Sequence, residues 1–194
     1  MKMDKSSVYD FGIDDDSVPS IEQTVDISKD VPPTVVQRYY ESRYATNVNE
    51  KPNQDYSVLI HSNNLCILSL APTHVLMGKT IDKIDFQVSG NTDRLSNIMT
   101  GKGKRGAQIV QAGSTLCKVH CSDGEEHKIL SAVPGKLVQM NSKLAETPNI
   151  MLTKPDDLGF IAIVLPQKQR FEKIKDGLLT KEQYTTRNSS LTEI

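Results

Sequence analysis

The amino-acid sequence predicts a mainly β domain, a small sandwich or barrel flanked by short helices. Between residues 56 and 165, apolar runs of strand length are separated by turn residues roughly every 8–12 positions, a spacing typical of such folds. The chain of 194 residues has room for one domain and a tail. Its hydrophobic content of 37% is low for a chain that is packed throughout, so part of it should lie outside the core.

That part is residues 1 to 30, which we expect to be a disordered acidic tail. The stretch holds eight Asp and Glu residues against three Lys residues, a net charge of −5. Such a segment cannot bury enough apolar surface to offset the entropy of ordering it. The whole chain carries −1, so the domain formed by residues 31 to 194 has a charge of +4. This mild charge argues against a dedicated nucleic-acid-binding protein.

The sequence also bears on the compartment of the protein. The N-terminus lacks the apolar region of a signal peptide. The longest apolar run, residues 160 to 165, is far shorter than the roughly 20 residues that cross a bilayer. Three cysteines, an odd number, suit reduced thiols in the cytoplasm or nucleus. We therefore expect a soluble protein that is not secreted and has no membrane partner.

The first element of the domain is predicted to be one amphipathic helix over about residues 34 to 45. Thr34 can cap it, and Val36, Tyr40 and Tyr44 recur at intervals of four residues.

The next two apolar runs, YSVLIHS and LCILSLA, are separated by Asn63-Asn64. Asn tolerates positive φ, so this pattern predicts a two-residue hairpin. KTIDKIDFQVS follows as a strand. Residues 90 to 113 are polar and rich in glycine, and they predict a long loop, or one short helix around residues 93 to 99 and then a loop.

The stretch LCKVHCSDGEEHKILSAVPG then folds as two alternating runs about Asp123-Gly124, with a return at Pro134-Gly135. KLVQM and the buried run FIAIVL are further strands. The chain should end in a helical segment over about residues 168 to 190. One helix carries Phe171, Ile174 and Leu178, and a second is capped by Thr180 with Gln183 three residues on.

Two motifs have competing interpretations. Cys117, His120 and Cys121 are residue types that bind zinc, but a strand points the two cysteines to one face and the histidine to the other. We therefore expect two buried thiols and no metal. Gly78-Lys79-Thr80 is similar to the end of a phosphate-binding loop, but the glycine required five positions earlier is Thr73. We interpret it as a turn that enters a strand.

The basic loop, defined as Lys102, Lys104 and Arg105 among glycines, is a candidate partner-binding site. It can bind a phosphate, an acidic protein surface or a nuclear import receptor, or it can be an ordinary solvated loop.

No pattern indicates a catalytic centre. No Ser, Cys or Thr lies in a nucleophile-elbow setting, and the sequence identifies no acidic partner for the histidines: His61, His74, His120 and His127. We expect a protein that is not an enzyme.

The stretch LVQMNSKLAETPNIMLTKPDDLGFIAIVLP resembles the second half of the glycine-cleavage H protein, a lipoyl carrier. The resemblance runs without a gap through seven residues: Gly135, Asn141, Leu144, Pro148, Pro155, Gly159 and Ile161. It implies an H-protein-like barrel-sandwich hybrid, a single hybrid motif in which two small antiparallel sheets present a hairpin.

In the H protein the hairpin tip carries the lysine that receives lipoate. The gapless register places that lysine at Gly124. A glycine cannot form the amide to lipoate or biotin, and the nearest lysine, Lys128, lies four residues down the second strand. The resemblance therefore implies a carrier scaffold that lacks its acceptor and holds no cofactor.

Over nearly all of the folded part, the sequence resembles the Abitram family, also called Simiate. The resemblance is carried by VVQRYY, GKTI, GKGKRGAQ, LCKVHCSDGEEH, VPGKLVQMN, GFIAIVLP and DGLLTKEQY, whereas the acidic tail does not align. It implies a protein that binds G- and F-actin and influences actin polymerisation and filopodia-like protrusions. It also implies a location in the nucleus, including speckles, and in the cytoplasm at cell projections such as lamellipodia.

Two alternatives stay open at this point. One is a lipoyl-type carrier in one-carbon or lipoate metabolism that uses Lys128 or another lysine. The other is an RNA-associated nuclear factor, although no aromatic stacking platform is visible. The acidic hairpin tip, defined as Asp123, Glu125 and Glu126, either docks a basic partner or keeps the tip soluble.

Overall fold

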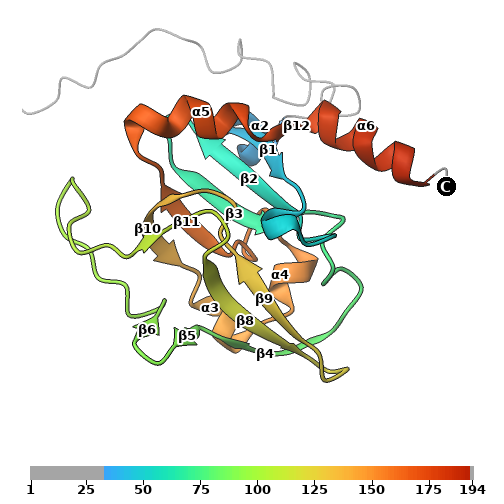
Figure 1. Ribbon diagram of the computed structural model, residues 1–194, viewed down its shortest axis with the longest axis horizontal. Helices are drawn as coiled ribbons and strands as arrows, with labels where there is room; N and C mark the ends of the chain where they lie inside the picture. Colours follow the sequence, from blue (N-terminus) through green and yellow to red (C-terminus); the bar gives the residue numbers. More distant parts are fainter. Residues whose placement is uncertain (1–32, 193–194) are drawn as a thin grey trace, which may run out of the picture. The chain divides into compact units, whose positions relative to one another are not determined.

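A seven-stranded antiparallel sheet and a three-stranded antiparallel sheet form the body of the domain (Figure 1). The computed structural model describes residues 33–192, so the expected acidic tail lies outside the described residues. The large sheet has the order β12 (Leu179–Thr180), β1 (Tyr40–Ala45), β2 (Tyr56–His61), β3 (Cys66–Leu70), β11 (Ala162–Leu165), β10 (Gly135–Met140) and β7 (Ile109–Val110). The second sheet has the order β4 (Ile81–Asp85), β8 (Thr115–Cys121) and β9 (Glu126–Leu130).

The inner faces of the two sheets share one hydrophobic core. Val58 and Leu68 of the large sheet belong to the same buried cluster as Val119 and Ile129 of the small sheet, and all four are fully buried. Burial of each such side chain contributes about 1.5–3 kcal/mol. The large sheet ends in a two-residue strand at each edge, so it does not close on itself. The mainly β class is confirmed, as an open pair of sheets and not as a closed barrel.

The predicted helix over residues 34 to 45 is wrong in its larger part. Helix α2 covers only Val35–Tyr39, and residues 40–45 form strand β1, which pairs along its whole length with β2. Tyr40 meets the ring of His61 edge-on, and Tyr44 stacks on Tyr184. A spacing of four residues places side chains on one face of a strand as well as of a helix, so the pattern could not distinguish the two.

The hairpin between β2 and β3 has three turn residues where two were predicted. The His61 N–H donates to the Leu65 carbonyl at 2.9 Å, and the Asn64 N–H donates back to the His61 carbonyl at 2.9 Å. Asn64 takes the left-handed conformation, with φ 67°. This is the three-residue hairpin in which the last turn residue is left-handed.

Residues 93 to 99 contain no helix. Strands β5 (Gln87–Ser89) and β6 (Thr92–Asp93) form a small hairpin, and the chain then continues without regular structure. Side-chain bonds hold this stretch: Arg94 donates to the Thr115 carbonyl and to Gln108, while Asn97 donates to the Leu137 carbonyl at 2.8 Å. These side chains replace the backbone hydrogen bonds that a helix would have made.

Several short helices complete the domain. The 3₁₀ turn η2 (Val48–Glu50) follows β1. Helices α3 (Lys143–Glu146) and α4 (Ile150–Thr153) lie in the segment that connects β10 to β11. The C-terminal segment contains η3 (Lys168–Arg170), α5 (Phe171–Asp176) and α6 (Lys181–Thr192).

The predicted cap of the last helix is present. The Thr180 hydroxyl accepts from the Gln183 N–H at 3.2 Å, and the Gln183 side chain accepts from the Thr180 N–H at 2.9 Å. No helix among the described residues has the length and apolar character needed to cross a membrane.

The residues that resemble the H protein hold the fold together. Asn141 is buried and donates to the carbonyls of Leu158 and Phe160 at 2.8 and 2.7 Å. Leu144 and Ile161 are fully buried. A Cβ atom at Gly135 would collide with the backbone of β11, so only glycine allows this close approach of β10 and β11.

Candidate functional site

The tip of the β8–β9 hairpin is the first candidate site, because the resemblance to the H protein implies that the acceptor position of a lipoyl carrier falls there. The Gly124 N–H donates to the Cys121 carbonyl, and the Cys121 N–H donates to the Glu125 carbonyl, both at 2.9 Å. Gly124 has φ +84° and open space where a Cβ atom would lie. A lysine at this position would fit sterically, but its backbone would be strained.

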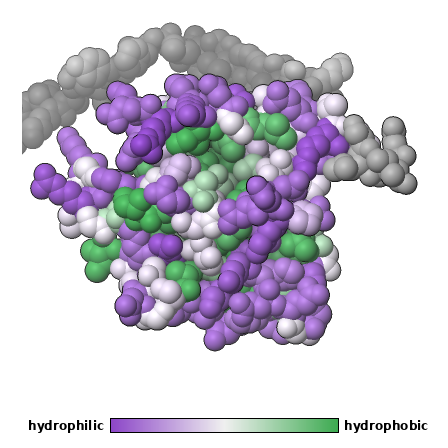
Figure 2. Space-filling view, in the orientation of Figure 1, coloured by the Kyte–Doolittle hydropathy of each residue, from purple (hydrophilic) through white to green (hydrophobic). Residues whose placement is uncertain are grey.

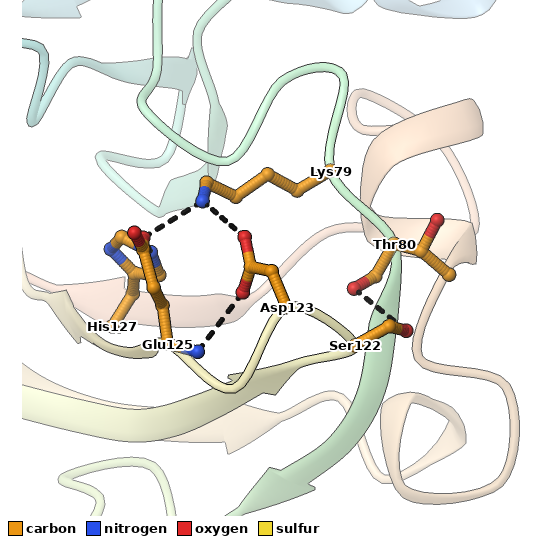
Figure 3. Close-up of polar contacts among 6 residues, drawn as sticks. All are labelled: Lys79, Thr80, Ser122, Asp123, Glu125 and His127. Atoms are coloured by element: carbon orange, nitrogen blue, oxygen red, sulfur yellow. Dashed lines mark hydrogen bonds and ion pairs between the residues drawn. The ribbon is translucent and has the colours of Figure 1, made fainter.

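Lys79 spans the tip from outside the hairpin (Figure 3). It extends from the turn before β4, and its Nζ lies 2.6 Å from Asp123 Oδ2 and 2.8 Å from Glu125 Oε2. Glu125 Oε2 also lies 2.9 Å from Nε2 of His127. Asp123 Oδ1 accepts from the Glu125 N–H at 2.9 Å, which fixes the turn. The tip is therefore closed by one cation between two carboxylates.

The charges at the tip stabilise one another. The hydrogen bond from Lys79 lowers the pKa of the Asp123 carboxyl and of the Glu125 carboxyl below their ordinary values. The same two carboxylates raise the pKa of Lys79. Lys79 is thus engaged by both carboxylates of the turn.

The hairpin tip is also attached to the strand beside it. The Ser122 N–H donates to the Thr80 carbonyl at 3.0 Å, and the Ser122 hydroxyl bonds to Asp82. These contacts extend the pairing of β8 with β4, in which Cys121 lies opposite Ile81. The hairpin is therefore fastened to β4 on one side, along residues 118 to 122.

The remaining residues of the acidic tip region lie on the strands. Glu126 Oε2 lies 3.8 Å from Nδ1 of His120. Lys128 lies in β9 with an exposed side chain, opposite Lys118 of β8 and away from the turn. Of the three carboxylates of the acidic hairpin tip, only Asp123 and Glu125 share a partner. The structure therefore does not bring all three to one site.

The basic loop is folded as a tight turn. Thr100 and Arg105 exchange two backbone hydrogen bonds at 2.9 and 3.0 Å, and the Lys104 N–H donates to the Gly101 carbonyl at 3.1 Å. Lys104 has φ 50°, which is the left-handed region. Lys102 and Arg105 are exposed. None of the three basic side chains forms an ion pair with a described residue.

The thiols lie in the core, as the strand alternation predicts. Cys66 and Cys117 are fully buried and Cys121 nearly so. Burial raises the pKa of the Cys66 thiol to about 12 and raises that of Cys117 as well, so neither forms a thiolate at neutral pH. Within residues 33–192, no three His, Cys, Asp or Glu side chains are placed to hold a metal ion.

The sequence did not identify Lys79 and His127 as part of the tip. Lys79 lies 44 residues from Asp123, and nothing near it in the sequence indicates a carboxylate partner. His127 does have an acidic partner that the sequence did not identify. This partner is Glu125, two residues away in the turn. The interpretation of Gly78-Lys79-Thr80 as a turn into a strand is confirmed, since β4 begins at Ile81.

The fold of the chain is similar to that of a solved lipoyl carrier. The crystal structure of a glycine cleavage system H protein from Mycobacterium marinum superposes with a TM-score of 0.50 at 15% sequence identity, covering 76% of this chain and 96% of that one. At this identity the likeness establishes the fold alone.

Comparison of the sequence with other proteins is more specific. No family model matches the chain. Protein Abitram of Bos taurus is 43% identical over 154 residues, which cover 78% of this chain and 82% of that protein. Protein Abitram of Homo sapiens is 42% identical over 156 residues, covering 79% and 86%. Protein Abitram of Drosophila melanogaster is 39% identical over 161 residues, covering 83% and 73%. With such identity over most of both chains, this protein is a member of the Abitram family.

Proposed function

We propose that this chain is a non-enzymatic protein that binds actin, modulates its polymerisation and influences filopodia-like protrusions. The observation that carries the proposal is the family membership, because the Abitram resemblance implies actin binding. We further propose a nuclear pool, including speckles, and a cytoplasmic pool at cell projections such as lamellipodia.

The hairpin tip supports a binding function over a carrier function. Gly124 stands where a carrier has its lysine, and it cannot form an amide to an acyl arm. Lys79 reaches the turn from outside the hairpin and forms ion pairs with Asp123 and Glu125. Among the described residues, the tip therefore offers no lysine outside an ion pair to accept an acyl arm.

Co-sedimentation with filamentous actin tests the proposal. The full chain should pellet with actin in a saturable manner at low salt and less at high salt, because surface charges are screened by added ions. An absence of pelleting across the whole salt series would contradict actin binding.

A pair of matched variants tests whether the basic loop makes the contact. Changing Lys102, Lys104 and Arg105 together to Ala should weaken binding modestly, because exposed charge pairs are worth about 0–1 kcal/mol each. The control removes three exposed positive charges elsewhere: Lys143, Lys154 and Lys181. Equal weakening by both triple variants would show an effect of net charge and not of the loop.

A further inference from the structure

An apolar pocket lies between the edge strand β7 and helix α5, beside the basic loop. It has a volume of about 80 Å³. Its wall includes Ile109, Val110, Pro134, Lys136, Arg170 and Ile174. We name it the Ile109 pocket, because Ile109 is 59% exposed although it is a large aliphatic residue. In Figure 2, hydrophobic surface lies on the left flank of the domain, next to the hydrophilic projection of the loop between β6 and β7.

We propose that the Ile109 pocket binds an extended acidic segment of a partner protein, with one aliphatic side chain of that segment inserted into the pocket. The size of the pocket supports this occupant. A cavity of about 150 Å³ holds a benzene molecule. The smaller volume here fits a single Val, Ile or Leu side chain.

The charges around the pocket specify an acidic partner. Lys136 and Arg170 stand in its wall, which contains no Asp or Glu. Lys136 donates to the Gly103 carbonyl at 2.6 Å, so the pocket and the basic loop form one continuous surface. Lys168, in the turn that also holds Arg170, is exposed.

None of these cations has an acidic partner among the described residues. Elsewhere in the domain, Lys79 pairs with Asp123 and Lys175 pairs with Glu41. The surface around the pocket therefore carries Lys136, Lys168 and Arg170 outside any ion pair among residues 33–192, and a carboxylate-rich segment complements these positive charges.

The backbone beside the pocket suits an extended segment. Strand β7 is the last strand of the large sheet. Val110 lies opposite Gly135, and the Leu137 N–H donates to the Gln108 carbonyl at 2.8 Å. Because hydrogen-bonding groups alternate along an antiparallel strand, the N–H and carbonyl of Ile109 point away from β10. A peptide in β conformation can pair with them while its side chain enters the pocket.

A nucleic acid is the other polymer that a cationic surface attracts, and the wall of the pocket argues against it. Single-stranded nucleic acids bind by stacking bases on aromatic side chains. None of the residues that line the Ile109 pocket is aromatic. The aliphatic wall favours the peptide.

Fluorescence anisotropy with the full-length protein tests the proposal. The probe is a labelled synthetic peptide in which Asp and Leu alternate. We expect saturable binding that weakens with added salt. A peptide with Lys in place of Asp should not bind, and one with Ser in place of Leu should bind several-fold more weakly. Failure of the Asp-Leu peptide to bind, or tighter binding of a single-stranded RNA oligomer, would overturn the proposal.

Matched variants locate the site. Ile109→Asp places a carboxylate on the rim of the pocket and should weaken peptide binding about tenfold, the factor expected for a loss of one well-placed apolar contact. Leu158→Asp is the control. Leu158 is a second exposed aliphatic residue, 40% exposed, and it does not line the pocket, so its replacement should leave peptide binding unchanged. Thermal melts check that both variants are folded. Equal peptide affinity of wild type and Ile109→Asp would exclude this site. Actin co-sedimentation is a separate measurement, so this proposal and the proposed actin function can fail independently.

Discussion

At the scale of single residues, the hairpin tip is an electrostatic structure that the local sequence did not reveal. The turn itself was predictable, because Asp123-Gly124 is a strong turn signal and Gly124 adopts the positive φ that this signal requires. The position of Lys79 was not predictable, because ion pairs across 44 residues depend on the register between β4 and β8. Turn chemistry is local, whereas charge pairing across a sheet is a property of the assembled fold.

Replacing Lys79 tests the closed tip. The pKa values of Asp123 and Glu125 are lowered in the folded state, so their interaction with Lys79 stabilises the fold above the unfolded-state values of 3.8 and 4.5. That stability is lost as the pH falls through the lower folded-state values. We expect Lys79→Met to be less stable than wild type at pH 7, with the difference vanishing under strongly acidic conditions. Urea denaturation at a series of pH values measures this.

Lys128→Met is the control for that experiment. Lys128 lies in the same sheet and is exposed, and it has no ion pair with a described residue. Its replacement should leave the pH dependence of stability as it is in wild type. A pH-independent loss of stability in Lys79→Met would argue against the ion pairs as its cause.

His74 predicts a second pH dependence, at higher pH. It is 2% exposed, its Nδ1 accepts from the Leu76 N–H at 3.1 Å, and its Nε2 has no partner among the described residues. Burial lowers the pKa of His74 to about 4, while the charge of Asp55 raises it and that of His127 lowers it. Between pH 6.5 and about 4 the unfolded state therefore binds a proton that the folded state does not.

Stability should consequently fall as the pH drops through this window. One pKa unit corresponds to about 1.4 kcal/mol. The change in the pKa of His74 from 6.5 to about 4 therefore lowers the free energy of unfolding by about 3 kcal/mol across this window. In His74→Asn, the side-chain oxygen can still accept from the Leu76 N–H, but the residue does not titrate. We expect a shallower decline in the free energy of unfolding between pH 6.5 and 4 in this variant. An identical slope in both proteins would contradict the assignment.

At the scale of elements, a prediction from the sequence was correct where the residues that determine the element lie close together in the chain. The cap of α6 was predicted correctly because both of its partners, Thr180 and Gln183, lie within four residues. Strand β1 was mistaken for a helix because its tyrosines, spaced by four, satisfy both periods. Its true state is decided by pairing with β2 and by the stack of Tyr44 on Tyr184, both of which are distant in sequence.

The cap of α6 offers a test at this scale. Thr180→Ala removes the hydroxyl that accepts from the Gln183 N–H and should lower the free energy of unfolding by about 1 kcal/mol. Thr185→Ala is the matched control, because Thr185 bonds only within the helix, to the Lys181 carbonyl. Alanine is a good helix former, so the control should be neutral or slightly stabilising. Equal effects of the two substitutions in thermal melts would rule out a special role of the cap.

At the scale of the whole molecule, the chain combines an H-protein-like fold with a hairpin tip that has Gly124 in its turn and Lys79 held between two carboxylates. The residues that carry the resemblance to the H protein, among them Gly135, Asn141 and Ile161, act in packing and backbone bonding. This explains why a fold can be inferred from them and a function cannot. The scaffold keeps its hairpin, but Lys79 fastens the tip from the neighbouring strand turn. A partner would bind such a scaffold through its surface. That surface includes the unpaired cations around the Ile109 pocket.

The most direct test of this account is the intact mass of the protein purified from the cells that make it, followed by peptide mapping of β8 and β9. The account predicts that no lysine carries an acyl arm, and that Lys79 and Lys128 in particular are found without one. A mass increment equal to one lipoyl group, located on Lys128 or any other lysine, would contradict it and would restore the carrier function.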